Sequence, residues 1–167
     1  DPAYPYWLIY RNNSFDSVAN KMTFDIFRVY RDRLITKAIT KPNGKFRVLK
    51  SRNIGNNEIV NIDGYDSYID DINSLDVSKF LNQENCVLVP NLTYNPRACM
   101  LPTGCIADGS VAILTLKNTN TKVSTEDLAF YATSQFNEFY AIARNRGTRS
   151  LNIDNNSVFF FGKLKHA

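Results

Sequence analysis

Residues 124–147 have the sequence STEDLAFYATSQFNEFYAIARNRG, which carries the strongest helical pattern in the chain. Ser124 and Asp127 have the spacing of a capping box, in which two side chains satisfy the first backbone N–H groups of a helix. Apolar residues then recur about every 3.6 residues, at Leu128, Tyr131, Ala132, Phe136, Phe139, Ile142 and Ala143. This pattern predicts one amphipathic helix over residues 125–143, which Gly147 helps to terminate.

Short apolar runs on either side of this helix predict strands. Residues 110–116 (SVAILTL) are best suited to a central strand, because they are apolar at almost every position. Further strands are expected within 6–10 (YWLIY), 23–36, 86–89 and 157–161 (SVFFF), and short helices within 14–22 and 76–82. Residues 65–72 have a helix-like spacing of apolar side chains. The turn sequence KPNGK at 41–45 predicts that residues 37–49 form a hairpin with a basic tip.

These elements do not alternate regularly between strand and helix. The expected fold class is therefore α+β, with short strands and hairpins packed on the long C-terminal helix at about 125–143. A length of 167 residues with 44% hydrophobic residues predicts one domain, residues 1–167. No apolar run approaches the roughly 20 residues that a membrane helix needs, so no membrane partner is expected.

The cysteines bear on the compartment. Cys86, Cys99 and Cys105 make an odd number in a chain that is too large to need disulfide staples. No signal peptide is recognisable at the start of the sequence. We therefore expect buried free thiols and a cytoplasmic location.

Motifs of several enzyme classes are absent. The chain has neither a GxGxxG nor a GxxxxGK[ST] loop, and its only histidine, His166, gives no basis for serine–histidine catalysis. The carboxylates at positions 63, 66, 70 and 71 lack the spacing of a calcium loop and are expected to form a solvated acidic face. The sequence NPRA at 95–98 lacks the second proline and the aromatic residue with which adenine amino-methyltransferases hold their target base. We therefore expect no catalytic residue, no metal and no cofactor on this chain.

Charge is distributed unevenly along the sequence. Residues 28–52 contain nine basic residues and one acidic residue, whereas residues 53–84 contain seven acidic residues and one basic residue. The first segment predicts a concentrated cationic surface of the kind that binds nucleic acids. A second basic group, Arg144, Arg146 and Arg149, follows the predicted helix, where one cation would also stabilise the helix dipole. An acidic protein partner and plain solvation are the alternatives for both groups.

Four stretches together resemble a known family. They are RDRLITK (31–37), FRVLKSRNI (46–54), NCVLVPNLTYNPRACMLPTGCIADGSVAIL (85–114) and LAFYATSQFNEFYAIARNRGTRSLNIDNNSVFFFG (128–162). In order and spacing they are similar to the target-recognition domain of type II restriction-modification adenine-specific DNA methyltransferases. The resemblance covers nearly the whole chain from about residue 23 onward.

The resemblance implies that catalysis and DNA recognition belong to different domains. In that family an N-terminal catalytic domain binds S-adenosylmethionine and carries an Asn-Pro-Pro-aromatic motif, while a C-terminal α/β domain reads the DNA sequence. This chain resembles the second part alone, a fragment of a larger methyltransferase. The implied partners are double-stranded DNA and the catalytic domain of the parent chain, and S-adenosylmethionine would bind to that parent domain.

Residue types then suggest roles in DNA recognition. Arginine is the best side-chain donor to guanine and asparagine the best partner for adenine, while contacts to phosphates set the register without reading sequence. The candidates for base reading are Arg31, Arg33, Arg52, Asn53 and Arg97. The candidates for backbone contact are Lys37, Lys41, Lys45, Arg144, Arg146 and Arg149. Two alternatives stay open: half of a type I specificity subunit, which the lack of a long heptad-bearing helix disfavours, and a non-catalytic basic domain that docks on an acidic protein.

Overall fold

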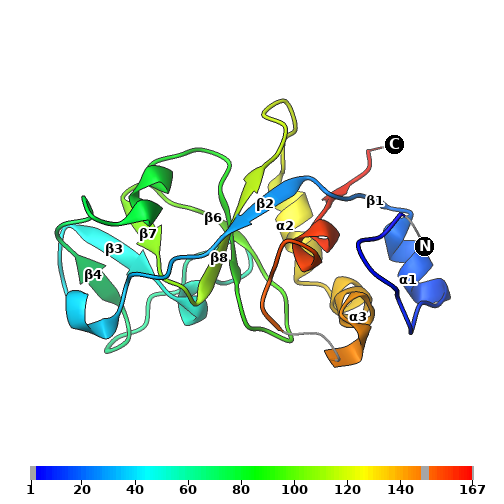
Figure 1. The fold of residues 1–167 in the computed structure, drawn as a ribbon, viewed down its shortest axis with the longest axis horizontal. Coiled ribbons are helices and arrows are strands. Elements are labelled where there is room, and N and C mark those ends of the chain that lie inside the picture. The colour runs from blue at the N-terminus through cyan, green and yellow to red at the C-terminus, as the bar shows by residue number, and fades with distance from the viewer. Residues whose placement is uncertain (1–2, 148–150, 167) are drawn as a thin grey trace.

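A four-stranded antiparallel sheet, in the order β2-β8-β5-β6, lies at the centre of the structure (Figure 1). The computed structural model describes residues 3–147 and 151–166. The strands of this sheet are β2 (Phe27–Tyr30), β8 (Val111–Leu116), β5 (Val87–Pro90) and β6 (Cys99–Met100). β8 has a neighbour on each side and is buried over its first four residues, which confirms the predicted central strand.

Two smaller sheets complete the strand structure. β3 (Phe46–Leu49) lies between β4 (Ser67–Ile69), to which it is antiparallel, and β7 (Cys105–Ala107), to which it is parallel. β1 (Met22–Thr23) and β9 (Lys163–Leu164) form an antiparallel pair. Figure 1 shows the three-stranded sheet at one end of the long axis and the β1–β9 pair toward the other. The 3-10 turns are η1 (Lys37–Ile39), η2 (Ser51–Asn53), η3 (Asp76–Phe80), η4 (Asn145–Gly147) and η5 (Ser157–Phe160).

The helix predicted over residues 125–143 is present but broken. α2 (Thr125–Tyr131) begins at the predicted capping box, and α3 (Ser134–Ala143) begins after a break at residues 132–133. Within the break, Thr133 has an extended backbone, and its hydroxyl accepts a hydrogen bond from the Phe136 N–H at 3.1 Å. A threonine that caps the second helix thus interrupts a pattern of apolar residues that continues across the break. The third helix, α1 (Asn13–Ala19), lies close to the range predicted for it.

Side chains alternate between the two faces of the central sheet and supply two hydrophobic cores. From β8, Ala112 and Leu114 enter the core formed with the helices, whereas Val111 and Ile113 enter the core shared with the three-stranded sheet. The largest fully buried rings of the first core are Phe15, Phe27, Tyr131, Phe136, Phe139, Phe160 and Phe161. The mixture of antiparallel sheets and helices around these cores confirms the predicted α+β class.

Several predicted elements differ from the structure. Residues 6–10 form no strand; they run past the end of α3, where Asn145 accepts a hydrogen bond from Ile9 N–H and donates one to Trp7 O. Residues 37–49 form no hairpin, because β3 pairs with β4 and β7 instead. Residues 157–161 contain the turn η5 rather than a strand, and residues 65–72 contain β4 rather than a helix.

The cysteines have the predicted state. All three are free and buried. Burial, with a smaller contribution from Cys105, raises the pKa of the Cys99 thiol to about 12. Among the described residues, no helix is long and apolar enough to cross a membrane.

Candidate nucleic-acid interface

The acidic segment pairs with the basic segment that precedes it. β3 and β4 are neighbouring strands, with Arg47 opposite Tyr68. Arg47 forms an ion pair with Asp66 at 3.1 Å, and Lys41 is in contact with Asp70. Charges that are separated along the sequence therefore partly neutralise one another in the fold.

Asp66 is the main acceptor in this pairing. Its Oδ2 accepts a hydrogen bond from the Ile62 N–H at 3.0 Å, and its Oδ1 accepts one from Asn53 Nδ2 at 2.7 Å. Burial alone would raise the pKa of Asp66, but these hydrogen bonds and the charge of Arg47 hold the pKa below its ordinary value of 3.8. The Asp66 carboxyl group is therefore ionised at neutral pH.

Asn53 lies inside the same network and not on the surface. It is 0% exposed, its Nδ2 also donates to Val60 O at 2.9 Å, and its Oδ1 accepts from the Lys50 N–H at 3.0 Å. These bonds use its side chain to hold η2 against residues 60–66. In this conformation Asn53 does not present its amide to a base edge.

Arg97 also makes its contacts within the fold. Its Nε donates to Ile54 O at 2.6 Å and one of its terminal nitrogens donates to Ser51 O at 3.4 Å. Burial lowers the pKa of its guanidinium. Arg97 thus fastens the loop before β6 to η2, which limits its freedom to reach DNA.

The basic group after α3 is divided between the interior and the surface. Arg144 is 4% exposed, and its guanidinium lies 5.8 Å from the ring centre of Tyr94. Arg146 is exposed, has a left-handed backbone with a φ of 51°, and lies 5.9 Å from the ring centre of Tyr10. Arg149 lies outside the described residues.

Four further candidates lie on the surface: Arg33, Lys37, Lys45 and Arg52. The Arg52 guanidinium lies 4.8 Å from the ring centre of Tyr65, and the Lys45 ammonium lies 5.2 Å from that of Phe46. A cation–π contact orients a side chain without neutralising its charge. These cations therefore remain suited to an anionic partner.

One groove collects arginine and asparagine side chains from two distant parts of the sequence. It has a volume of about 390 Å³ and is lined by Val29, Arg31, Arg33, Asn152, Ile153, Asp154 and Asn155. Arg31 donates to Asn152 Oδ1 at 2.7 Å across a separation of 121 positions, and Asn91 Nδ2 donates to the same oxygen at 2.7 Å. We refer to it as the Arg31 groove.

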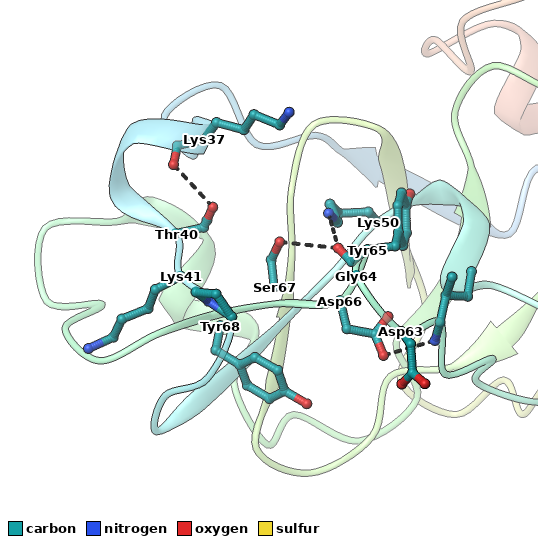
Figure 2. Close-up of a pocket in the computed structure, with 12 residues that line it drawn as sticks. Lys37, Thr40, Lys41, Lys50, Asp63, Gly64, Tyr65, Asp66, Ser67 and Tyr68 are labelled. Atoms are coloured by element: carbon teal, nitrogen blue, oxygen red, sulfur yellow. Dashed lines mark hydrogen bonds between the residues drawn. The ribbon is translucent and has the colours of Figure 1, made fainter.

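A larger groove lies beside the three-stranded sheet and has mixed charge (Figure 2). It has a volume of about 640 Å³, and the charged residues that line it are Lys37, Lys41, Lys50, Asp63 and Asp66. The Lys50 ammonium lies 3.9 Å from the ring centre of Tyr65 and donates to its carbonyl oxygen. In Figure 2 the side chains of Lys37 and Lys41 extend in different directions, so they do not converge on one point. We refer to it as the Lys37 groove.

No protein-family model and no curated protein matches the chain. Within residues 3–147 and 151–166, no group of three or more histidine, cysteine, aspartate or glutamate side chains is placed to hold a metal ion. The exposed side chains and their geometry are therefore the basis for a function.

Sequence reasoning missed two contributors to the Arg31 groove, Asn152 and Asn155. The candidate residues come from basic stretches and end at Arg149, although the sequence SLNIDNN that follows at 150–156 is rich in asparagine. The asparagine content of this loop, which follows the arginines at 144–149, was the sequence feature that could have identified these two residues. The proximity of that loop to Arg31 depends on the fold and is not visible in the sequence.

Proposed function

We propose that this chain is the DNA-reading module of a type II restriction-modification adenine-specific DNA methyltransferase. In this proposal it binds duplex DNA by sequence and holds the target adenine for a catalytic domain of the parent chain, which would also bind S-adenosylmethionine. The observation that carries the proposal is the Arg31 groove, in which two arginines and two asparagines line one surface. The family resemblance of residues 31–37, 46–54, 85–114 and 128–162 supports the methyltransferase class.

The side chains of the Arg31 groove suit base edges in the major groove of DNA. Arginine donates two parallel hydrogen bonds to guanine O6 and N7, and asparagine forms two with adenine N6 and N7. Arg31 is already oriented by Asn152, which lowers the entropy that it would lose on binding a base. Arg33 and Asn155 are exposed at the same groove and are the side chains best placed to read bases.

Exposed cations on other elements suit contacts to phosphates. Lys37 in η1, Lys45 before β3 and Arg52 in η2 belong to the end of the molecule with the three-stranded sheet, whereas Arg146 follows α3 (Figure 1). Contacts of this kind position a duplex without reading its sequence. Lys41, whose charge is met by Asp70, contributes less.

Selection of binding sites from a duplex library of randomised sequence tests the proposal. Arg33→Ala or Asn155→Ala removes a base contact and is expected to relax preference at one position, by about 5- to 150-fold, corresponding to roughly 1–3 kcal/mol. Lys37→Ala is expected to weaken all sequences equally. Arg11→Ala is the control, because Arg11 pairs with Asp16 on α1 and lines neither groove.

Two results would reject the proposal. One is the absence of binding to any duplex at low salt, where phosphate contacts are strongest. The other is that Arg33→Ala and Asn155→Ala leave both the affinity and the selected sequence unchanged. Tighter binding to an acidic polypeptide than to DNA would favour a protein-docking domain instead.

A further inference from the structure

A third groove is lined by charges of a single sign. It has a volume of about 560 Å³ and is lined by Thr23, Ile26, Asn120, Thr121, Lys122, Lys163, Leu164, Lys165 and His166. Among the described residues no carboxylate lines it, whereas Asp63 and Asp66 line the Lys37 groove and Asp154 lines the Arg31 groove. We refer to it as the lysine groove. None of its lysines belongs to the basic segment 28–52 or to the basic group at 144–149.

Hydrogen bonds to backbone carbonyl groups position the segments that carry these lysines. Lys163 lies on β9, and its ammonium donates to the Lys122 carbonyl oxygen at 2.8 Å. The backbone N–H of Lys165 donates to the carbonyl oxygen of Lys21 at 2.7 Å, which brings a further lysine alongside. The fold thus brings Lys122, Lys163 and Lys165 to one groove, with the backbone of Lys21 beside Lys165.

Two carboxylates lie near these elements, and both have partners other than the three lysines of the groove. Asp25 is in contact with Lys117. Asp127 is 1% exposed and accepts hydrogen bonds from the backbone N–H groups of Leu164, at 2.8 Å, and Ser124, at 2.9 Å. Among the described residues no carboxylate forms an ion pair with Lys122, Lys163 or Lys165, so their charges remain available to an anion.

The lysine groove and the Arg31 groove lie at opposite ends of β2. Ile26, just before β2, lines the lysine groove, while Val29 and Arg31 at the other end line the Arg31 groove. β2 is an edge strand of the central sheet, and its Arg28 is exposed. At about 3.4 Å per residue, the backbone from Ile26 to Arg31 spans about 17 Å, the rise of about five base pairs of duplex. One duplex is long enough to contact both grooves.

We propose that Lys122, Lys163 and Lys165 bind the sugar-phosphate backbone of the same duplex whose base edges face the Arg31 groove. This inference rests on the proposed function, because it takes DNA as the ligand. Lysine ammonium groups are compact charges that bind phosphates without distinguishing bases. The lysine groove therefore supplies affinity and not specificity.

A triple variant, Lys122→Gln with Lys163→Gln and Lys165→Gln, tests the inference. Glutamine keeps a long polar side chain and removes the charge at each position. Because three cations no longer neutralise phosphates, the slope of log affinity against log salt concentration is expected to fall in magnitude by about 3, and affinity at about 0.1 M salt by more than about tenfold. The probe is a set of fluorescently labelled duplexes of about 20 base pairs and different sequences, followed by anisotropy from about 50 to 300 mM NaCl. All sequences are expected to weaken equally.

A matched control removes the same formal charge elsewhere. Arg11→Gln, Lys50→Gln and Lys79→Gln change three cations that line neither the Arg31 groove nor the lysine groove, and Arg11 has a carboxylate partner. The control is expected to change the salt slope by less than about 1. Circular dichroism and thermal unfolding verify that both triple variants are folded.

The outcomes separate this inference from the proposed function. Wild-type protein that binds no duplex at low salt overturns the proposed function and this inference with it. Wild-type protein that binds DNA, with an unchanged slope in the folded lysine variant or an equal change in the control, overturns this inference alone. Tighter binding of poly-glutamate than of duplex through these three lysines also overturns it, because the ligand is then an acidic polypeptide.

Discussion

Replacing Asp66 by alanine removes the carboxylate that ties the acidic segment to the basic one. That carboxylate accepts hydrogen bonds from the Ile62 N–H at 3.0 Å and from Asn53 Nδ2 at 2.7 Å, and it forms the ion pair with Arg47 at 3.1 Å. The side chains of the ion pair are each 17% exposed. Water can therefore replace little of the ion pair and the hydrogen bonds that the substitution removes.

The expected loss follows from these interactions. Removing a hydrogen bond to a charged group costs about 1.5–3 kcal/mol, and breaking a buried ion pair costs about 3–5 kcal/mol, but the two overlap at Asp66. Arg47 keeps its hydrogen bond to Asn61 Oδ1 at 2.5 Å, which limits the penalty of leaving its charge behind. We expect the free energy of unfolding to fall by about 3 kcal/mol, which in a chain of this size lowers Tm by roughly 6–12 °C.

Urea denaturation and thermal unfolding measure this loss. Asp70→Ala is the matched control, because Asp70 also contacts a basic partner, Lys41, but has a side chain that is 54% exposed. An exposed pair contributes about 0–1 kcal/mol. A double-mutant cycle with Arg47→Ala isolates the pairwise contribution. Equal small losses for Asp66→Ala and Asp70→Ala would refute the conclusion that the acidic segment anchors the basic one through Asp66.

The same substitution predicts a pH dependence. The pKa of Asp66 is lower in the folded protein than the ordinary value of 3.8, so the unfolded chain binds its proton more readily. The contribution of Asp66 to stability is therefore present above about pH 4 and is lost as the pH falls through the folded pKa. The difference in unfolding free energy between wild type and Asp66→Ala should narrow on acidification. A difference that widens below pH 4 would show that the carboxylate is not stabilised by its neighbours.

Two further predictions concern the helix break and the thiols. Thr133→Ala removes the cap of α3 and is expected to cost about 1 kcal/mol in urea denaturation, whereas Thr133→Ser, which keeps the hydroxyl, should retain most of that stability; equal losses would exclude a capping role. Because the three cysteines are buried and the pKa of Cys99 is raised to about 12, none is expected to react rapidly with a thiol reagent at pH 8 in the native protein, and all three should react after denaturation. A rapidly reacting thiol in the native state would contradict this.

Patterns of apolar residues correctly predicted the segments in which burial follows one regular pattern from end to end. β8 is buried on both faces, so a continuous apolar run identified it. The helical period over 125–143 persists through the break at Thr133, because α2 and α3 bury side chains in the same core. The helical spacing of apolar residues therefore predicted where the helices lie. It could not predict the break, because the break depends on one hydrogen bond of the Thr133 hydroxyl.

Predictions from local sequence were wrong where the partner of a segment lies far away in the sequence. The residues KPNGK at 41–45 favour a turn, but the strand after them, β3, takes β4 and β7 as neighbours. A hairpin would have paired residues 37–40 with β3 instead. The run YWLIY at 6–10 has the composition of a strand, yet it is held by Asn145 and exposes Trp7 at 75%. Partner choice in both cases is decided by long-range packing.

Charge counts predicted where cations occur but not which of them are neutralised. A segment such as 28–52 gives no indication that Asp66 and Asp70 lie next to Arg47 and Lys41 after folding. Likewise, burial of Asn53 at 0% exposure follows from its bonds to residues 50, 60 and 66, which only the fold brings together. The remaining exposed cations are fewer than the sequence suggested and lie on different elements.

Arg28 on the edge strand β2 and the three lysines of the lysine groove have different explanations. An exposed edge needs a charged residue to prevent pairing with another chain, and Arg28 on β2 meets that need without any ligand. The three lysines of the lysine groove protect no edge of that sheet, because they lie on β9, just after it and in the loop before α2. Among the described residues they form no ion pair, so their charges remain available to an anion. The proposal of nucleic-acid binding therefore rests on the lysine groove and on the arginine and asparagine side chains of the Arg31 groove, and not on Arg28.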